Sequence, residues 1–174
     1  PAEAKGLLLT AIQDPNPVVF ITHKRLLPMK DEVPEKNEPI PFGKADVKRV
    51  GSDVTCIATS FLVHKVLQVA ETLSQKNISV EVIDPRTLVP FDKDTIIESV
   101  KKTSRAGIVH EAHTFGGIGG EIAAILADEA FGYLDAPIKR VGAIWSPIPF
   151  PSVLEDFVLP QEQDIEKAIH SVLE

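Results

Sequence analysis

The sequence predicts an α/β fold of three layers, in which helices cover both faces of a mostly parallel mixed sheet. Short runs of β-branched and other apolar residues alternate with segments of helical periodicity, and this order is typical of parallel sheets. Gly51-Ser52-Asp53 has the character of a hairpin turn between the first two strands, which predicts one antiparallel edge strand. The expected strands span residues 46–50, 54–59, 78–83, 106–110 and 137–141.

Three amphipathic helices are expected between and after these strands, because apolar residues recur there at the helical period. Each stripe is wide enough to cover part of one face of the sheet. The stripes are Val63, Val66, Leu67, Ala70 and Leu73; Ile118, Ile122, Ile125 and Leu126; and Ile165, Ala168, Ile169 and Val172.

The stretch from residue 78 to 97 contains a strand, its exit and the start of the next helix. Pro85 has no N–H to donate, so it is expected to end the strand. Asp92 is a suitable N-cap for a helix that buries Ile96, Ile97 and Val100. The intervening residues 86–91 are too apolar for a free surface loop, and we expect them to lie against another subunit or domain.

The first 43 residues have a different organisation. Residues 3–13 show a helical pattern with Leu7, Leu8, Ala11 and Ile12, and residues 17–21 read as a strand. Residues 25–43 contain four prolines among charged residues, which indicates an extended, semi-rigid linker. We therefore expect a small N-terminal segment over 1–24, a linker over 25–43 and an α/β domain over 44–174. A chain that begins at Pro1 is expected to be a fragment or a processed product.

Composition excludes some classes of function. The net charge of −7 and the pI near 5.3 argue against nucleic-acid binding, since the basic residues are scattered. No apolar run approaches the roughly 20 residues of a membrane span, and no signal peptide is visible, so a cytoplasmic location is expected. Cys56, the single cysteine, lies in a strand-like run and is interpreted as a buried structural thiol.

Two motifs could carry chemistry. The glycine run 116–120 follows a strand and opens a helix, but Ile122 stands where a dinucleotide fingerprint needs glycine, so a tight turn is favoured over phosphate binding. His110, Glu111 and His113 form the only acid–base cluster, and their spacing lacks a metal motif. Structural or interface hydrogen bonding is therefore favoured for them. His23, His64 and His170 are isolated polar residues, and no surrounding motif assigns them a role.

Several stretches together resemble one enzyme family. Residues 4–20, 41–48, 80–96, 109–122, 134–141 and 154–160 are similar, in order, to the β subunit of the thiamine-diphosphate-dependent 2-oxo acid dehydrogenases, the group that acts on pyruvate, branched-chain 2-oxo acids or acetoin. The resemblance runs nearly end to end. It implies that residues 44–174 form a transketolase C-terminal-like domain and that residues 1–24 are the last helix and strand of the pyrimidine-binding domain.

The resemblance also implies where function lies. In such enzymes thiamine diphosphate and magnesium bind between an α subunit and the N-terminal domain of the β subunit, so no catalytic or cofactor-binding residue is expected here. A structural potassium ion is implied at Ala11, Ile12, Asp14 and Asn16. A second β subunit and the α subunit are implied as partners, without nucleic acid or membrane.

A further implied partner is the subunit-binding domain of the dihydrolipoyl acyltransferase. Its docking surface would comprise Phe131, Tyr133, Asp135 and the C-terminal carboxylate of Glu174. In a eukaryote, the location would be the mitochondrial matrix.

Two alternatives stay open: the C-terminal domain of a transketolase or deoxyxylulose-phosphate-synthase-like enzyme, and a stand-alone binding or scaffolding domain. The sequence does not say which 2-oxo acid or acetoin is the substrate.

Overall fold

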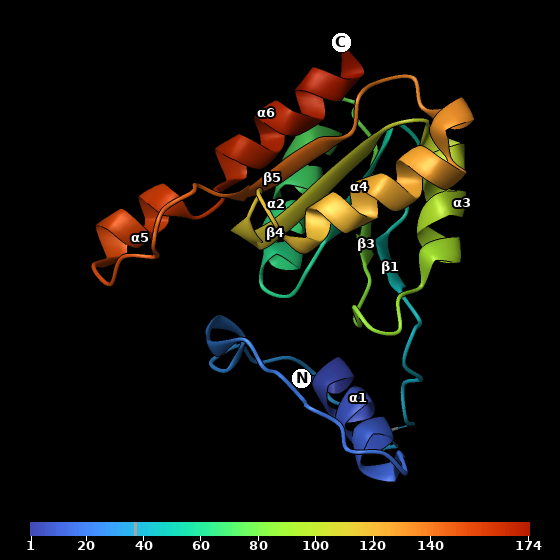
Figure 1. Cartoon of the computed structure of the whole chain (residues 1–174), viewed down its shortest axis with the longest axis vertical. Helices are drawn as coiled ribbons and strands as arrows, with labels where there is room; N and C mark the ends of the chain where they lie inside the picture. Colours follow the sequence, from blue (N-terminus) through green and yellow to red (C-terminus); the bar gives the residue numbers. More distant parts are fainter. Residues whose placement is uncertain (37) are drawn as a thin grey trace.

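The computed structural model describes residues 1–36 and 38–174 and contains the expected five-stranded sheet (Figure 1). The spatial order of the strands is β1-β3-β2-β4-β5. Their bounds are β1 Asp46–Arg49, β2 Val54–Ala58, β3 Val80–Asp84, β4 Ala106–His113 and β5 Lys139–Ala143. The pairs β2–β3, β2–β4 and β4–β5 are parallel, and β1 pairs antiparallel with β3 at the edge. The predicted mixed sheet with one antiparallel edge strand is confirmed.

The predicted hairpin between the first two strands is wrong. β1 pairs with β3, so β1 and β2 are not neighbours. The turn is instead attached to the start of β3, because the Gly51 N–H donates to a carboxylate oxygen of Glu81 and the Asp53 N–H donates to the Ser79 carbonyl. The chain therefore passes the amino end of β3 before it enters β2, which lies on the other side of β3 from β1.

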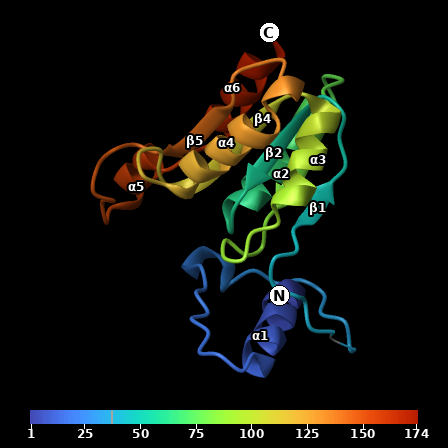
Figure 2. The same cartoon turned by 45° about the vertical axis from the view of Figure 1, so that its right-hand side comes forward.

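Helices cover both faces of the sheet and form the predicted three layers (Figures 1 and 2). α2 (Leu62–Ser74) and α6 (Glu162–Leu173) pack on one face, where Val54, Cys56 and Ala58 join their core. α3 (Lys93–Thr103) and α4 (Ile118–Glu129) pack on the other face against a core that includes Ile57 and Ile108. The alternation of β2 side chains between two cores is the period of two expected of a central strand.

The exit of β3 follows the sequence prediction. β3 ends at Asp84, directly before Pro85, and α3 begins after Asp92. The Asp92 carboxylate accepts hydrogen bonds from the Thr95 N–H and from the Ala45 N–H, 2.9 Å away. Burial alone would raise the pKa of Asp92, but these hydrogen bonds outweigh it and lower the pKa. Asp92 thus caps α3 and ties it to the start of β1.

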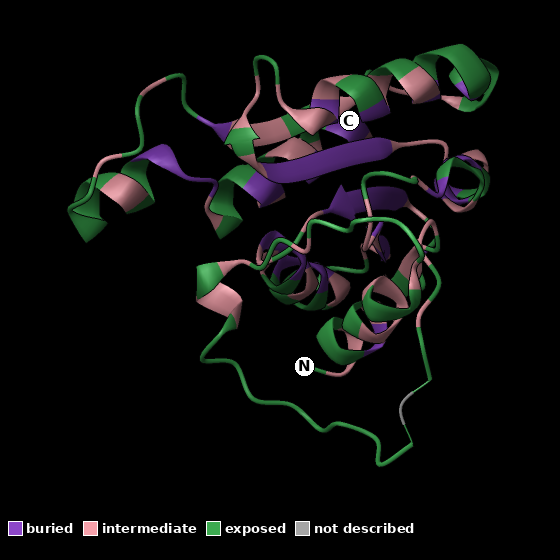
Figure 3. Cartoon of the chain, turned by 60° about the horizontal axis from the view of Figure 1, so that its bottom comes forward, coloured by how far each residue is buried: buried purple, intermediate pink, exposed green. Residues whose placement is uncertain are grey.

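The N-terminal segment contains α1 (Ala2–Gln13) and a short 3-10 helix, η1 (Lys24–Leu26). The strand expected at residues 17–21 is not formed, because no strand in the described ranges pairs with it. Most of the expected linker is exposed, as the green trace in Figure 3 shows, and Asn37 within it lies outside the described residues. α1 is attached to the domain through Glu3, whose carboxylate contacts Lys48 Nζ at 2.7 Å and Arg86 Nε at 2.6 Å.

Two further features complete the fold. α5 (Ser152–Val158) projects from the body between β5 and α6 (Figures 1 and 2). Cys56 is buried, and burial raises the pKa of its thiol to about 12, so the predicted structural role of this residue is confirmed. Across residues 1–36 and 38–174, every helix is too short or too polar to cross a membrane.

Candidate functional site

The strand order places one edge of the sheet where α/β proteins commonly bind ligands. From β2 the chain moves to β3 on one side, and from β3 it crosses to β4 on the other, so the order reverses between β2 and β4. The carboxyl ends of two strands at such a reversal flank a crevice. Phe61, which follows β2, and Glu111, near the end of β4, lie at this edge of the sheet.

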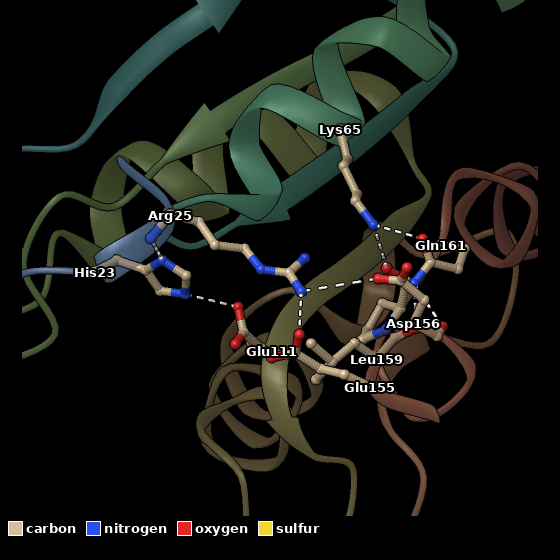
Figure 4. Close-up of polar contacts among 9 residues, drawn as sticks. His23, Arg25, Lys65, Glu111, Glu155, Asp156, Leu159 and Gln161 are labelled. Carbon is tan, nitrogen blue, oxygen red and sulfur yellow. Dashed lines mark hydrogen bonds and ion pairs between the residues drawn. The ribbon is translucent and has the colours of Figure 1, made fainter. Parts of the chain in front are cut away.

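η1 packs against this edge of the sheet through His23 (Figure 4). His23 Nδ1 accepts a hydrogen bond from the Arg25 N–H at 3.1 Å, so the neutral ring carries its proton on Nε2. His23 Nε2 then donates to Glu111 Oε2 at 2.7 Å. The His23 ring also stacks on Phe61, with centroids 5.9 Å apart and an interplanar angle of 12°. One imidazole therefore joins η1, the end of β4 and the start of α2.

Arg25 extends the contact to α5. Its guanidinium Nη2 lies 2.8 Å from Glu155 Oε2 and 3.8 Å from Asp156 Oδ1. The same group lies over the Phe61 ring, 5.7 Å from the centroid, which is within the range of a cation–π contact. This role of His23 and Arg25 was not predicted from the sequence. The cationic run of residues 23–25, set between an apolar segment and the proline-rich linker, was the available signal.

Lys65 of α2 completes the cluster in Figure 4. Its ammonium donates to the Pro160 carbonyl at 2.9 Å and to Gln161 Oε1 at 2.7 Å, at the junction of α5 and α6. Burial, with the nearby positive charge of Arg25, lowers the pKa of Lys65. Every cation of the cluster thus has an acceptor within the chain, and the arrangement is built for holding elements together.

His110 lies just inside the same edge and is almost fully buried, at 1% exposure. Among the described residues, neither of its ring nitrogens has a hydrogen-bond partner, and burial lowers the pKa of the imidazole. A Cβ added at Gly117 or Gly142 would lie 2.7 or 2.9 Å from the His110 ring, and one at Gly119 would also meet it. The glycines are needed for close packing, which fits the predicted tight turn.

His110, Glu111 and His113 do not converge on one point. Glu111 contacts His23, whereas His113 Nε2 lies 2.8 Å from the Ser146 carbonyl and its ring packs edge-on against Trp145. In the part of the chain that the structure describes, no three His, Cys, Asp or Glu side chains are grouped to hold a metal ion. Hydrogen bonding, rather than proton transfer or metal binding, is what this geometry supports.

The residues expected to hold potassium lie at the C-terminal end of α1. Ala11 would pair with the N–H of residue 15, but Pro15 has none. The Asn16 N–H, which would serve Ile12, donates to Asp14 Oδ1 at 2.8 Å instead. Within the described residues, the carbonyls of Ala11 and Ile12 and the second Asp14 oxygen are therefore available, and oxygens of this kind suit a hard cation.

The expected docking surface, defined by Phe131, Tyr133, Asp135 and Glu174, is exposed. Its first two members belong to η2 (Phe131–Tyr133), and the C-terminus lies at the same end of the domain as the connection from α4 to β5 (Figures 1 and 2). A hollow of about 400 Å³ is lined there by Ala127, Phe131, Leu134, Asp135, Ala136, Pro137 and Ile138.

Two apolar segments at the opposite end of the strands are also exposed. Val89, in the loop after β3, is 92% exposed, and Trp145 and Phe150, in the loop after β5, are 70% and 100% exposed. Phe115 packs edge-on against Trp145, with ring centroids 5.2 Å apart. Such large side chains are seldom left in water unless a partner covers them.

Comparison with known proteins places these observations in a family. The family model described as "Transketolase, C-terminal domain" matches residues 43–165. The chain is 50% identical over 168 residues to the "Pyruvate dehydrogenase E1 component subunit beta" of Rickettsia felis, covering 97% of this chain and 52% of that protein. It is 49% identical to the "Acetoin:2,6-dichlorophenolindophenol oxidoreductase subunit beta" of Bacillus subtilis, covering 95% of this chain and 48% of that protein.

A solved structure agrees with the sequence relatives. The "Split gene transketolase, inactive beta4 tetramer" superposes with a TM-score of 0.71 at 26% identity, over 82% of this chain and 46% of that one. The chain thus spans about half the length of the curated relatives that it matches. These relatives confirm the resemblance to dehydrogenase β subunits, and the chain belongs to the transketolase C-terminal domain family.

Proposed function

We propose that this chain is the C-terminal part of the β subunit of a thiamine-diphosphate-dependent 2-oxo acid or acetoin dehydrogenase. The 50% identity over 97% of the chain to a pyruvate dehydrogenase β subunit is the observation that carries the proposal. Residues 1–24 would belong to the preceding pyrimidine-binding domain, residues 25–43 to the linker and residues 44–174 to the C-terminal domain. The enzyme would work in the cytoplasm, or in the mitochondrial matrix of a eukaryote.

The proposed contribution of this part is assembly rather than chemistry. The polar cluster at the carboxyl edge is internally paired, with His23 bound to Glu111 and Arg25 to Glu155, and this pairing supports a structural role for it. Thiamine diphosphate and magnesium would bind elsewhere in the complete β subunit, together with the α subunit. Calorimetric titration of this chain with both should give no saturable heat, and micromolar binding would contradict the proposal.

Self-association of β subunits is the first proposed assembly role. Trp145 and Phe150 on one loop and Leu88 and Val89 on another are apolar and exposed, and a two-fold interface buries the same surface twice. The related split gene transketolase chain, by its name, forms a β4 tetramer and is inactive, which supports both self-association and the absence of activity.

Docking of the acyltransferase subunit-binding domain is the second proposed role. The hollow beside Phe131 and the exposed carboxylate of Asp135 suit a small basic partner. Electrostatic attraction would raise the association rate and make it salt-sensitive, since the Debye length falls from roughly 10 Å at 0.1 M salt to 3 Å at 1 M.

Surface plasmon resonance with the cognate subunit-binding domain tests the docking proposal. Asp135→Lys should slow association, or weaken affinity by about 2 to 5 kcal/mol if a buried hydrogen-bonded pair is lost. Asp31→Lys, which makes the same charge change in the linker, is the matched control and should retain affinity. Unchanged kinetics for folded, dimeric Asp135→Lys would remove Asp135 from the docking surface.

Potassium binding at the end of α1 is proposed for Ala11, Ile12, Asp14 and Asn16. The carbonyls of Ala11 and Ile12, which have no N–H partner among residues 1–36 and 38–174, support it, as does the Asp14 carboxylate. Thermal unfolding should shift upward in potassium chloride relative to choline chloride of equal ionic strength, and Asp14→Ala should abolish the difference. Equal melting temperatures in the two salts for the unaltered chain would contradict this site.

A transketolase-like enzyme is the second candidate, favoured by the likeness to the split gene transketolase. Such an enzyme would share the domain and its self-association but would not dock an acyltransferase. Loss of binding to every subunit-binding domain tested, with self-association intact, would therefore favour the transketolase-like alternative.

A further inference from the structure

Residues 23–26, hereafter the clamp, contact three elements that are far apart in the sequence. His23 reaches Glu111 at the end of β4, Arg25 reaches Glu155 on α5, and both side chains lie on the Phe61 ring before α2. Figure 4 shows His23 beside Arg25, with His23 directed toward Glu111 and Arg25 toward Glu155 and Asp156. The clamp is therefore the point at which the N-terminal segment, the sheet edge and α5 meet.

α5 has few other anchors on the domain. Its C-terminal end belongs to a small buried cluster of Ala143, Val158 and Leu159, and the Ile144 N–H donates to the Val158 carbonyl at 3.0 Å. The first half of the helix, by contrast, is exposed, including Val153 and Leu154. Arg25 contacts Glu155 and Asp156 in the middle of α5. The buried cluster holds only the C-terminal end of this helix.

The position of α5 also determines the position of the loop before it. Residues 144–151 run from the end of β5 to the start of α5, so both ends of this loop are set by those elements. The loop carries Trp145 and Phe150, two exposed aromatic side chains of the proposed dimer surface. If α5 is fixed, these two side chains are held in one arrangement before association. Less conformational entropy is then lost when a second chain binds.

We propose that residues 23–26 act as an intramolecular clamp that holds α5 against the carboxyl edge of the sheet and thereby positions the 144–151 loop for contact with a second copy of the chain. His23 anchors the clamp to β4, and Arg25 is the positioning residue for α5. The consequence for self-association rests on the proposed function, whereas the hold on α5 rests on the contacts alone.

Hydrogen exchange on the full chain tests the hold on α5. Arg25→Gln should increase exchange of the α5 amides by about threefold to tenfold, the range expected when one half-exposed ion pair and one cation–π contact are lost. Arg25→Lys should give a smaller increase, because an ammonium lacks the planar fork of a guanidinium. Lys76→Gln removes a comparable ion pair to Glu166, away from the clamp, and should leave α5 unchanged.

A charge reversal provides a second test of the same contact. Arg25→Glu should increase α5 exchange further than Arg25→Gln, and adding Glu155→Arg should restore much of the protection. Unchanged α5 exchange in folded Arg25→Gln, or no restoration in the double variant, would overturn the clamp.

Sedimentation then separates the clamp from the proposed dimer. If the unaltered chain dimerises, Arg25→Gln should raise its dissociation constant by about threefold to tenfold, matching the exchange result. A monomeric unaltered chain whose α5 exchange still responds to Arg25→Gln would support the clamp and contradict dimerisation. If Arg25→Gln dimerises with the same dissociation constant as the unaltered chain, the positioning role of Arg25 is overturned.

Discussion

The ion pair between Lys102 and buried Glu81 allows a prediction whose magnitude depends on pH. The Glu81 side chain is 3% exposed and that of Lys102 is 48% exposed. The Glu81 carboxylate accepts hydrogen bonds from Lys102 Nζ, from Ser99 Oγ and, at 3.1 Å, from the Gly51 N–H. Burial alone would raise the pKa of Glu81, but these three donors outweigh burial and hold the pKa below its ordinary value of 4.5.

Lys102→Met keeps the apolar stem of the side chain and removes its charge. A hydrogen bond to a charged group contributes about 1.5 to 3 kcal/mol, and the lower end applies here because Lys102 is half in water. We therefore expect Lys102→Met to lower the free energy of unfolding by roughly 1.5 kcal/mol near pH 7. Two donors stay on Glu81, so the chain should still fold.

The pH dependence follows from the lowered pKa of Glu81. In the unaltered chain, the stabilisation by Glu81 is fully present above pH 4.5 and is lost as pH falls through the lower pKa of the folded state. Without the Lys102 ammonium, burial shifts the pKa of Glu81 upward. As pH falls, Glu81 of the variant therefore takes up a proton before Glu81 of the unaltered chain does, and the variant no longer bears the cost of an unpaired buried charge. The difference in unfolding free energy should therefore shrink between about pH 7 and about pH 4.

Urea unfolding followed by circular dichroism at both pH values measures this difference. Lys101→Met is the matched control. Lys101 is the neighbour of Lys102 in the sequence, but its ammonium pairs with the exposed carboxylate of Glu98. That variant should change the unfolding free energy by less than about 0.5 kcal/mol. An equal loss for Lys102→Met at both pH values would refute the assignment of the buried charge to Glu81.

Three further results are expected. Asp92→Ala should lower the unfolding free energy by about 1 to 2 kcal/mol in urea titration, because the cap and the bond to Ala45 are both lost; an unchanged midpoint would contradict this. Cys56 should react with a thiol reagent only after unfolding, since burial raises its pKa to about 12; rapid labelling of the native chain would disprove burial. Gly119→Ala should destabilise by about 1 to 3 kcal/mol through the His110 ring, whereas Gly132→Ala, with open space around it, should cost much less.

Most of the domain could be predicted because its local signals agree with its tertiary structure. Pro85 ends β3 and Asp92 starts α3 through local chemistry, and the stripe from Val63 to Leu73 is buried as its period predicts. Pairing across the sheet is a different matter. Gly51 to Asp53 resembles a hairpin turn locally, but hydrogen bonds to Ser79 and Glu81 place β1 beside β3.

The candidate site was less predictable because it depends on contacts over long sequence separations. The cationic run at residues 23–25 marks the segment, but it does not indicate that His23 meets Glu111 or that Arg25 meets Glu155. The strand expected at residues 17–21 has the β-branched residues of a strand, yet a strand also needs a neighbour, which composition does not supply. His110 is similar: its glycine neighbours come partly from β5, through Gly142.

Sedimentation equilibrium of the unaltered chain tests the proposed assembly role most directly. At about 100 µM the chain should be a dimer, because an association of about 8 kcal/mol corresponds to a micromolar dissociation constant. Introducing Glu at Trp145 and Phe150 should give a monomer, while Val50→Glu, an equally exposed site outside the surface, should not. A chain that stays monomeric at this concentration, or a dimer that tolerates both substitutions, would contradict the account.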